Sequence, residues 1–258
     1  MFQEERLTLI LQYLQEKQRI EVDEICGLLG ISRDTARRDI IKLEQQGVIV
    51  RTRGGAILPP VSKVIPGYEQ RMELDTPLKD SIGRLAATLI HDSDYLYVDA
   101  STTVRHTIEH MTSKNNCVVT NSLHTAEALT RKDGVHIHML GGIMSNEHRF
   151  VYGPRAIEML DDYRIEKAFL GACGIASDGL STSFEDECYL IRHVIRMAEQ
   201  VILVTDHSKF GKKLFHKVAD LSDIDIIVTN QEPDKQLREH LHANEIDIMI
   251  AGEQDRID

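Results

Sequence analysis

Apolar residues recur at helical spacing along the first fifty residues of the chain. The spacing predicts one helix over 4–17 and a shorter helix over 22–29, because the apolar positions of each fall on a single face. A third helix is expected to begin after Ser32, whose hydroxyl suits an N-cap, and to end at Gly47, where a left-handed residue is favourable. Gly30 supplies the tight turn between the last two helices. The pattern therefore predicts a trihelical unit.

The third helix has an apolar inner face and a charged outer face. Ala36, Ile40 and Leu43 recur at i, i+4 and i+7 and share the inner face. Guanidinium groups on the outer face suit the major groove of DNA, where arginine reads guanine or binds phosphate. A charged surface helix alone indicates no ligand, but two short apolar runs after it bracket residues 51–55, a flexible basic tip. Such a tip is typical of a hairpin that lies along phosphates or enters a minor groove.

Residues 6–56 resemble the N-terminal winged helix-turn-helix of the DeoR family of bacterial transcriptional regulators. The matching positions are Arg6, Ile31-Ser32, Thr35, Arg37-Arg38-Asp39, Leu43, Gly47, Arg51 and Gly54-Gly55-Ala56. The family often has His before the paired glycines, whereas this chain has Arg53, which keeps the positive charge without the titration. The helix pattern and the resemblance together imply that operator DNA is contacted by Ser32, Arg33, Thr35, Arg37, Arg38, Lys42, Arg51, Arg53 and Gly54.

Proline separates this unit from the rest of the chain. Three of the six prolines fall within residues 59–66, and proline disfavours regular structure around it. From Pro77 onward, short apolar strands alternate with helices, which indicates an α/β domain with a largely parallel sheet. We therefore expect a winged helix-turn-helix domain over 1–57, a linker over 58–75 and an α/β domain over 76–258.

The composition excludes several classes of protein. A chain of 258 residues, 42% apolar and 28% charged, has room for one small and one medium globular domain. No apolar run approaches about 18 residues and no basic-then-apolar leader is seen, so we expect a cytoplasmic protein that spans no membrane. The four cysteines are widely spaced, which suggests neither a disulfide framework nor a thiolate zinc site.

The net charge of −11 is unusual for a DNA-binding protein. Its distribution resolves part of the conflict, because residues 31–57 carry a net charge of +3. An acidic body behind a basic edge disfavours indiscriminate binding, since phosphates repel every orientation except the one that leads with the basic face.

Polar residues and glycines follow five of the strands expected in the α/β domain. These segments are 99–103, 120–122, 141–142, 171–174 and 206–209. Ligands of open α/β sheets bind beyond the carboxyl ends of the strands, where the start of a helix suits a phosphate. Turn residues are polar in every protein, but five successive strand ends of this kind favour a phosphorylated ligand.

The C-terminal part also resembles the DeoR family, from residue 77 to about 252. This resemblance implies a domain similar to ribose-5-phosphate isomerase that senses a phosphorylated sugar. The matching positions are Lys79, Asp99, Ser101-Thr102-Thr103, Thr120-Asn121-Ser122, Gly141-Gly142, Gly153, Phe169, Gly174, Gly179, Glu187, Asp206 and Ser208-Lys209-Phe210-Gly211. The chain departs from the family at Ala100, where glycine is usual, so a backbone approach to phosphate is slightly less open there.

Roles at this site follow as hypotheses. The hydroxyls at 101–103 would bind the phosphate, Asp99 and Asn121 would bind sugar hydroxyls, and Lys209 would supply a cation. Glu187 would either bond a sugar hydroxyl or hold Lys209. The residues expected to bind the effector are Asp99, Ser101, Thr102, Thr103, Thr120, Asn121, Ser122, Gly141, Gly142, Gly174, Glu187 and Lys209.

Two functions from different classes remain open. The first is a DNA-binding repressor of a carbohydrate-utilisation operon, controlled by a phosphorylated sugar and acting as a homo-oligomer. The second is a sugar-phosphate isomerase with a regulatory head, since Asp, Glu and Lys also serve proton transfer. The isomerases' Asp-Gly-Ala-Asp-Glu segment is absent, residues 177–180 being the nearest approach. We expect the repressor, with no cofactor and no metal, because the pairs His106/His110 and His136/His138 lack a convergent carboxylate or thiol.

Overall fold

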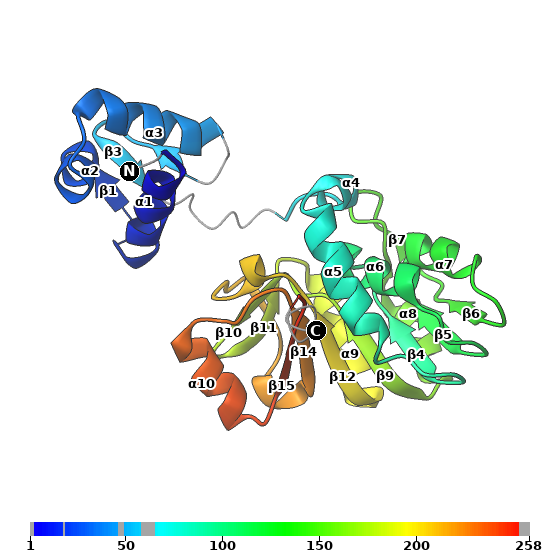
Figure 1. Cartoon of the computed structure of the whole chain (residues 1–258). Helices are drawn as coiled ribbons and strands as arrows, with labels where there is room; N and C mark the ends of the chain where they lie inside the picture. Colours follow the sequence, from blue (N-terminus) through cyan, green and yellow to red (C-terminus); the bar gives the residue numbers. More distant parts are fainter. Residues whose placement is uncertain (1–2, 18, 46–48, 58–64, 253–258) are drawn as a thin grey trace. The chain divides into compact units, whose positions relative to one another are not determined.

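The computed structural model describes residues 3–17, 19–45, 49–57 and 65–252 (Figure 1). The chain divides into two compact units, Met1–Ser62 and Lys63–Asp258. The elements of the first unit are α1 (Gln3–Lys17), β1 (Arg19–Glu21), α2 (Val22–Leu29), α3 (Arg33–Gln45), β2 (Val50–Arg51) and β3 (Gly55–Ile57).

The three helices of the first unit enclose its core, as the apolar spacing predicts. Ile10, Ile25 and Ile40, one from each helix, are fully buried together. The Ser32 hydroxyl accepts a backbone N–H of the first turn of α3 at 3.3 Å, which confirms the predicted start of that helix. The predicted end at Gly47 lies outside the described residues.

A buried ion pair joins α1 to α3. Arg6 Nε lies 2.7 Å from Oδ2 of Asp39, which is fully buried, and Gln3 donates to the other carboxylate oxygen at 3.0 Å. Burial alone would raise the pKa of Asp39, but the hydrogen bonds from Arg6 and Gln3 hold it below its usual value. Arg6 and Asp39, two positions of the predicted helix-turn-helix motif, therefore orient α3 and are not available to contact DNA.

The wing is a three-stranded antiparallel sheet in the order β1-β3-β2, of which β1 was not predicted. Gly55 pairs with Glu21, and a Cβ on Gly55 would lie 1.9 Å from the Ile20 carbonyl oxygen. Gly54 is exposed and a Cβ on it would meet nothing within 4 Å. The second glycine of the pair is thus required by strand packing, and the first lies at the hairpin tip.

The second unit is the predicted α/β domain (Figure 1). Its helices are α4 (Tyr68–Glu73), α5 (Thr76–Ala87), α6 (Thr102–His110), α7 (Leu123–Leu129), α8 (Pro154–Leu160), α9 (Glu185–Met197) and α10 (Lys235–Ala243), with 3-10 turns η1 (His207–Lys209) and η2 (Leu221–Asp223). Its strands are β4 (Tyr95–Val98), β5 (Cys117–Thr120), β6 (His136–Met139), β7 (Ile143–Met144), β8 (Val151–Tyr152), β9 (Ile165–Leu170), β10 (Gly174–Ala176), β11 (Gly179–Thr182), β12 (Ala198–Val204), β13 (His216–Ala219), β14 (Ile226–Thr229) and β15 (Asp247–Ile250). Within the part of the chain described, no helix has the length and apolarity needed to cross a bilayer.

Seven parallel strands form the main sheet, in the order β15-β14-β12-β9-β4-β5-β6. Helices cover both faces, which is why the strands read as short apolar runs. Leu96 and Val98 of β4 pack with residues of α5, α6 and α7, whereas Tyr97 packs on the opposite face with residues of α8, α9 and α10.

Of the seven strands of the main sheet, β4 comes first along the chain, and it lies inside the sheet. β5 and β6 follow on one side of β4, and β9, β12, β14 and β15 lie on the other. The strand order therefore reverses between β4 and β9. Such a topological switch point opens a crevice at the carboxyl ends of the two strands.

The expected elements of the α/β domain are present with shifted ends. Helix α9 ends at Met197, because Ala198 pairs with Ile165 at the start of the β12–β9 ladder. Helices α4 and α8 and the short strands β7, β8, β10, β11 and β13 were not predicted. Helix α4 lies within the interval expected as linker and packs against α6. The domain limits 1–57, 58–75 and 76–258 stay predictions.

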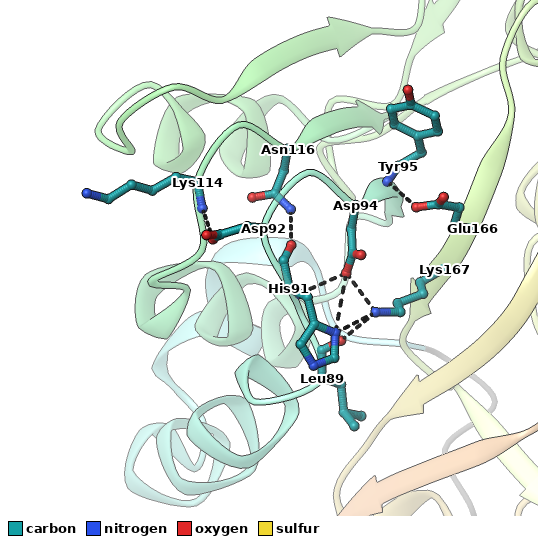
Figure 2. A network of polar contacts seen from close by, with 9 residues as sticks. All are labelled: Leu89, His91, Asp92, Asp94, Tyr95, Lys114, Asn116, Glu166 and Lys167. Carbon is teal, nitrogen blue, oxygen red and sulfur yellow. Dashed lines mark hydrogen bonds and ion pairs between the residues drawn. The ribbon is translucent and has the colours of Figure 1, made fainter.

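A polar network around Lys167 lies at the amino ends of strands β4, β5 and β9, at the end of the sheet opposite to the crevice (Figure 2). Its Nζ donates to Asp94 Oδ2 at 2.7 Å and to the Leu89 carbonyl at 3.0 Å, and lies 2.9 Å from Nδ1 of His91. Asn116 donates to the His91 carbonyl at 2.6 Å. The contacts of Lys167 and Asn116 join the loop between α5 and β4 to the neighbouring strands β9 and β5 and so fix its position.

Candidate functional site

A groove lies between α3 and the wing in the first unit. Its lining residues are Glu21, Val22, Asp23, Arg33, Arg37, Ile40, Ile41, Arg51, Thr52, Arg53, Gly54 and Gly55. The groove brings together five of the residues predicted to contact DNA, four of them arginines. Helix α3 and the wing thus present their positive charge on one surface, as the sequence pattern predicts.

Carboxylates of the same unit accompany several of these arginines. Arg33 lies 2.6 Å from Asp23, and Arg51 lies 3.7 Å from Glu44, all with exposed side chains. Exposed ion pairs contribute only about 0–1 kcal/mol, so a DNA phosphate can replace the carboxylate at small cost.

The other residues predicted to contact DNA lie outside this groove. Ser32 and Thr35 face each other, with 2.9 Å between their hydroxyl oxygens at the start of α3. Lys42 donates to the Gln3 side chain at 2.9 Å, which directs it toward α1. Arg38 is exposed on α3. Their contacts with DNA stay predictions.

A crevice in the second unit lies at the switch point between β4 and β9. Its lining residues are Arg71, Asp99, Ala100, Ser101, Gly171, Ala172, Cys173, Leu180, Ser181, Thr182, Glu187, Ile191 and Val218. Two of the predicted strand-end segments meet here, one after each strand. The crevice is therefore built where an open α/β sheet binds its ligand.

Asp99 joins the two strand ends. Its carboxylate accepts the Ser101 N–H at 2.8 Å and the Gly171 N–H at 2.7 Å. Burial raises the pKa of Asp99 to about 7, although both amide donors lower it. A Cβ on Gly171 would lie 2.3 Å from the Ser101 Cβ, so the close approach of the loops requires glycine at that position.

Three strand ends share one kind of turn, in which a side chain accepts the backbone N–H two residues later. The pairs are Asp99 with Ser101 at 2.8 Å, Thr120 with Ser122 at 3.1 Å and Asp206 with Ser208 at 2.8 Å. The Ser101 hydroxyl in turn caps α6 by accepting the N–H groups of Thr103 and Val104. Side chains of the protein therefore already bind several of the amides that the sequence pattern offers to a phosphate.

Three of the residues predicted to bind the effector line the crevice: Asp99, Ser101 and Glu187. The others lie at or near the same edge without lining it, namely Thr102, Thr103, Thr120, Asn121, Ser122, Gly141, Gly142, Gly174 and Lys209. Several have internal partners. Thr120 donates to the Val98 carbonyl at 2.6 Å, and Asn121 donates to the Val151 carbonyl at 3.2 Å. Effector binding by these residues stays a prediction.

Glu187 and Lys209 do not pair in the way offered as one alternative. Glu187 accepts the Thr182 hydroxyl at 2.7 Å, and burial raises the pKa of its carboxyl. Lys209 Nζ lies 3.7 Å from the Asp206 carboxylate and keeps about a third of its side chain exposed. Among residues 3–17, 19–45, 49–57 and 65–252, no group of three or more His, Cys, Asp or Glu is placed to hold a metal ion.

Arg71 is the cation that the sequence analysis missed. It lies in α4, within the segment read as linker, and its guanidinium lines the crevice beside Asp99 and Glu187. The six residues of α4 are too few to give a helical period. The sequence signal for this helix was the acidic residue Glu69, because an acidic residue in the first turn favours a helix start.

Comparisons with known proteins agree with both units. Residues 6–60 match the DeoR-like helix-turn-helix domain, and residues 75–231 match the DeoR C terminal sensor domain. The chain is 44% identical to the HTH-type transcriptional repressor GlcR of Bacillus subtilis (strain 168), over 99% of this chain and 98% of that protein. It is 28% identical to the glycerol-3-phosphate regulon repressor of Escherichia coli (strain K12), over 97% of this chain and 100% of that protein.

Among solved structures, ribose 5-phosphate isomerase A from Neisseria gonorrhoeae aligns with 56% of this chain and 56% of its own, at 15% identity and a TM-score of 0.37. The two family matches together span nearly the whole described chain, and one relative exceeds 40% identity over almost its full length. The chain belongs to the DeoR family of helix-turn-helix transcriptional regulators.

Proposed function

We propose that the protein is a repressor that binds operator DNA through its first unit. It releases the DNA when a phosphorylated sugar binds to its second unit. The observation that carries this proposal is the crevice at the switch point, where Arg71 lies beside polar strand ends and its buried Nε has no hydrogen-bond partner among the described residues. Such a site suits an anion with several hydroxyl groups.

The relatives support the same reading. GlcR is named as a transcriptional repressor, and another relative is named for a regulon of a phosphorylated three-carbon alcohol. Neither is named as an enzyme, which favours the repressor over the isomerase alternative. The regulated genes are proposed to serve carbohydrate use.

Location and assembly belong to the same proposal. A protein that controls operator DNA acts where that DNA is, which for a bacterial regulator is the cytoplasm. We also propose that it works as a homo-oligomer, because one recognition helix and one wing bury little surface and two-fold pairing doubles the contact.

The sensing role is tested by melting the protein against a panel of sugar phosphates. A ligand that binds only the folded state raises the melting temperature by mass action, so one or more members of the panel should raise it. Glucose 6-phosphate, fructose 6-phosphate, ribose 5-phosphate and glycerol 3-phosphate form the panel, with glucose, fructose and ribose as unphosphorylated controls. A sugar phosphate that stabilises the protein should also weaken its binding to operator DNA in a gel-shift titration. A flat response to the whole panel contradicts the proposed function.

A further inference from the structure

We propose that Arg71 binds the phosphate group of the effector, and that α4, which carries Arg71, passes this binding on to the chain that enters the second unit. The inference rests on the proposed function and deepens it. It names the cation that receives the phosphate, and the structural element through which the ligand reaches the linker.

The Arg71 guanidinium lies against the Tyr68 ring but keeps a buried N–H without a hydrogen-bond partner among the residues that the structure describes. Among the residues that the structure describes, Arg71 forms no ion pair, and its buried Nε has no hydrogen-bond partner. Its guanidinium carbon lies 5.8 Å from the centre of the Tyr68 ring. A buried guanidinium N–H is normally satisfied, so an open one at a crevice indicates a ligand that accepts hydrogen bonds.

Several other donors at this crevice are already engaged. Asp99 accepts the N–H groups of Ser101 and Gly171, and the Ser101 hydroxyl accepts those of Thr103 and Val104. Among the described lining residues, Arg71 is the single Lys or Arg. An anion must therefore obtain its strongest hydrogen bonds from Arg71, whose planar fork matches two phosphate oxygens.

Neighbouring carboxyl groups fit a ligand of this kind. Asp99 and Glu187 line the same crevice as Arg71. Carboxyl groups beside an arginine accept sugar hydroxyls while the guanidinium binds the phosphate. The crevice thus holds one basic group for the anion and two acidic groups for hydroxyls.

Helix α4 has six residues and is too short to be a stable helix alone. Its position depends on contacts with the domain. The buried Lys79 side chain donates to the carbonyls of Arg71 and Leu74. At the other end, Tyr68 donates its backbone N–H to the Glu147 carbonyl at 3.0 Å and stacks its ring 4.4 Å from that of His124.

Arg71 therefore connects the ligand to the point where the chain enters the second unit. Its backbone N–H bonds the carbonyl of Gly67, the residue before α4. A phosphate that binds the guanidinium adds a tertiary contact to α4 and favours one position of this helix. The ligand can change operator affinity only by favouring one arrangement of the chain over another, and α4 is the element on which it acts.

The experiment compares Arg71→Gln, Arg71→Lys and the control Arg149→Gln in the full-length protein. Arg149 lies 3.8 Å from Glu69, so the control removes a guanidinium beside the opposite face of α4, and Arg149 does not line the crevice. Calorimetry measures the affinity for each sugar phosphate of the panel and for inorganic phosphate. Arg71→Gln should weaken binding by about 10-fold or more, the loss of one charge-assisted contact, and Arg71→Lys should lie between it and the wild type.

The coupling is measured as the ratio of operator affinities with and without a saturating sugar phosphate. This ratio should approach one for Arg71→Gln at the concentration that saturates the wild type, and stay at the wild-type value for Arg149→Gln. Hydrogen exchange of residues 68–74 should slow when the sugar phosphate is added to the wild type.

The outcomes separate two failures. If the wild type binds no sugar phosphate, both the proposed function and this inference fail. If the wild type binds one and both Arg71 variants bind it as tightly as the wild type does, the sensing function stands and the role of Arg71 is wrong. Should Arg71→Gln fail to fold, Arg71→Lys decides alone, because unchanged affinity in that variant excludes a bidentate contact with phosphate.

Discussion

At the scale of single residues, the crevice depends on backbone groups that approach closely. Gly171 brings the end of β9 against the end of β4, and its N–H is one of the two donors to Asp99. A side chain at this position would need the space that Ser101 occupies. Gly171, which has no side chain, thus sets the distance between the two loops.

We expect Gly171→Ala to destabilise the second unit by about 1–3 kcal/mol, because overpacking forces neighbouring groups apart. The shift would also separate Asp99 from one of its donors and reduce sugar-phosphate binding. Denaturant unfolding and calorimetry measure the two effects. Gly27→Ala is the matched control, since a Cβ there meets nothing within 4 Å. Wild-type stability and affinity in Gly171→Ala would show that the loops are not held by this contact.

The sequence predicted which strand ends would carry polar groups, but not how those groups would be used. Asp99, Ser101 and Glu187 reach the crevice, whereas Thr120 and Ser122 bond within their own turn. A hydroxyl that binds a ligand and one that closes a turn have the same sequence signal. Arg71 could not be predicted, since only the tertiary fold brings α4 to the end of β4.

At the scale of secondary-structure elements, burial on both faces decided what could be predicted, since several strands of the main sheet are no longer than strands that were missed. The inner strands of the parallel sheet contain apolar runs that mark them, because both faces of that sheet are covered. Strand β1 and the strands of the small antiparallel sheets have two to four residues. Such strands form only when a partner is already in place, as Ile20 of β1 pairs with Ala56 of the wing.

Helix α3 and the wing should contribute differently to operator binding. We expect Arg37→Ala to weaken binding to the operator more than to unrelated DNA, because a recognition helix reads base edges. Arg53→Ala should weaken both to a similar extent and lower the salt dependence, since the wing tip contacts phosphates. Gel shifts at two salt concentrations on operator and unrelated duplexes distinguish the two patterns. Both side chains are exposed, so melting temperatures should stay near that of the wild type.

If Arg37→Ala loses affinity equally for every duplex, α3 is not the reading element. A loss at one base position only in Arg53→Ala would place the wing tip in contact with a base.

At the scale of the whole molecule, charge limits how the protein meets DNA. The chain carries a net charge of −11, yet residues 31–57 carry +3. One copy therefore offers a small basic surface backed by negative charge, which can neutralise only a few phosphates.

We expect at least a dimer at micromolar concentration, with two first units on two half-sites one helical turn apart. Analytical ultracentrifugation with and without operator duplex measures the mass of the particle. A duplex carrying one half-site should bind much more weakly than one carrying both. A monomer under both conditions would leave the selectivity for an operator unexplained and contradict the expectation.

The central place of β4 also affects how the chain is made. β4 is synthesised before the strands on either side; β5 pairs with one of its edges, and β6 pairs with β5. Its other edge has no partner until residues 165–170 have left the ribosome. An open strand edge is a template for pairing with other chains, so a nascent protein stalled before β9 is exposed to aggregation. The pairing of β9 with β4, which forms the crevice in the finished protein, is therefore also the step that covers the open edge of β4.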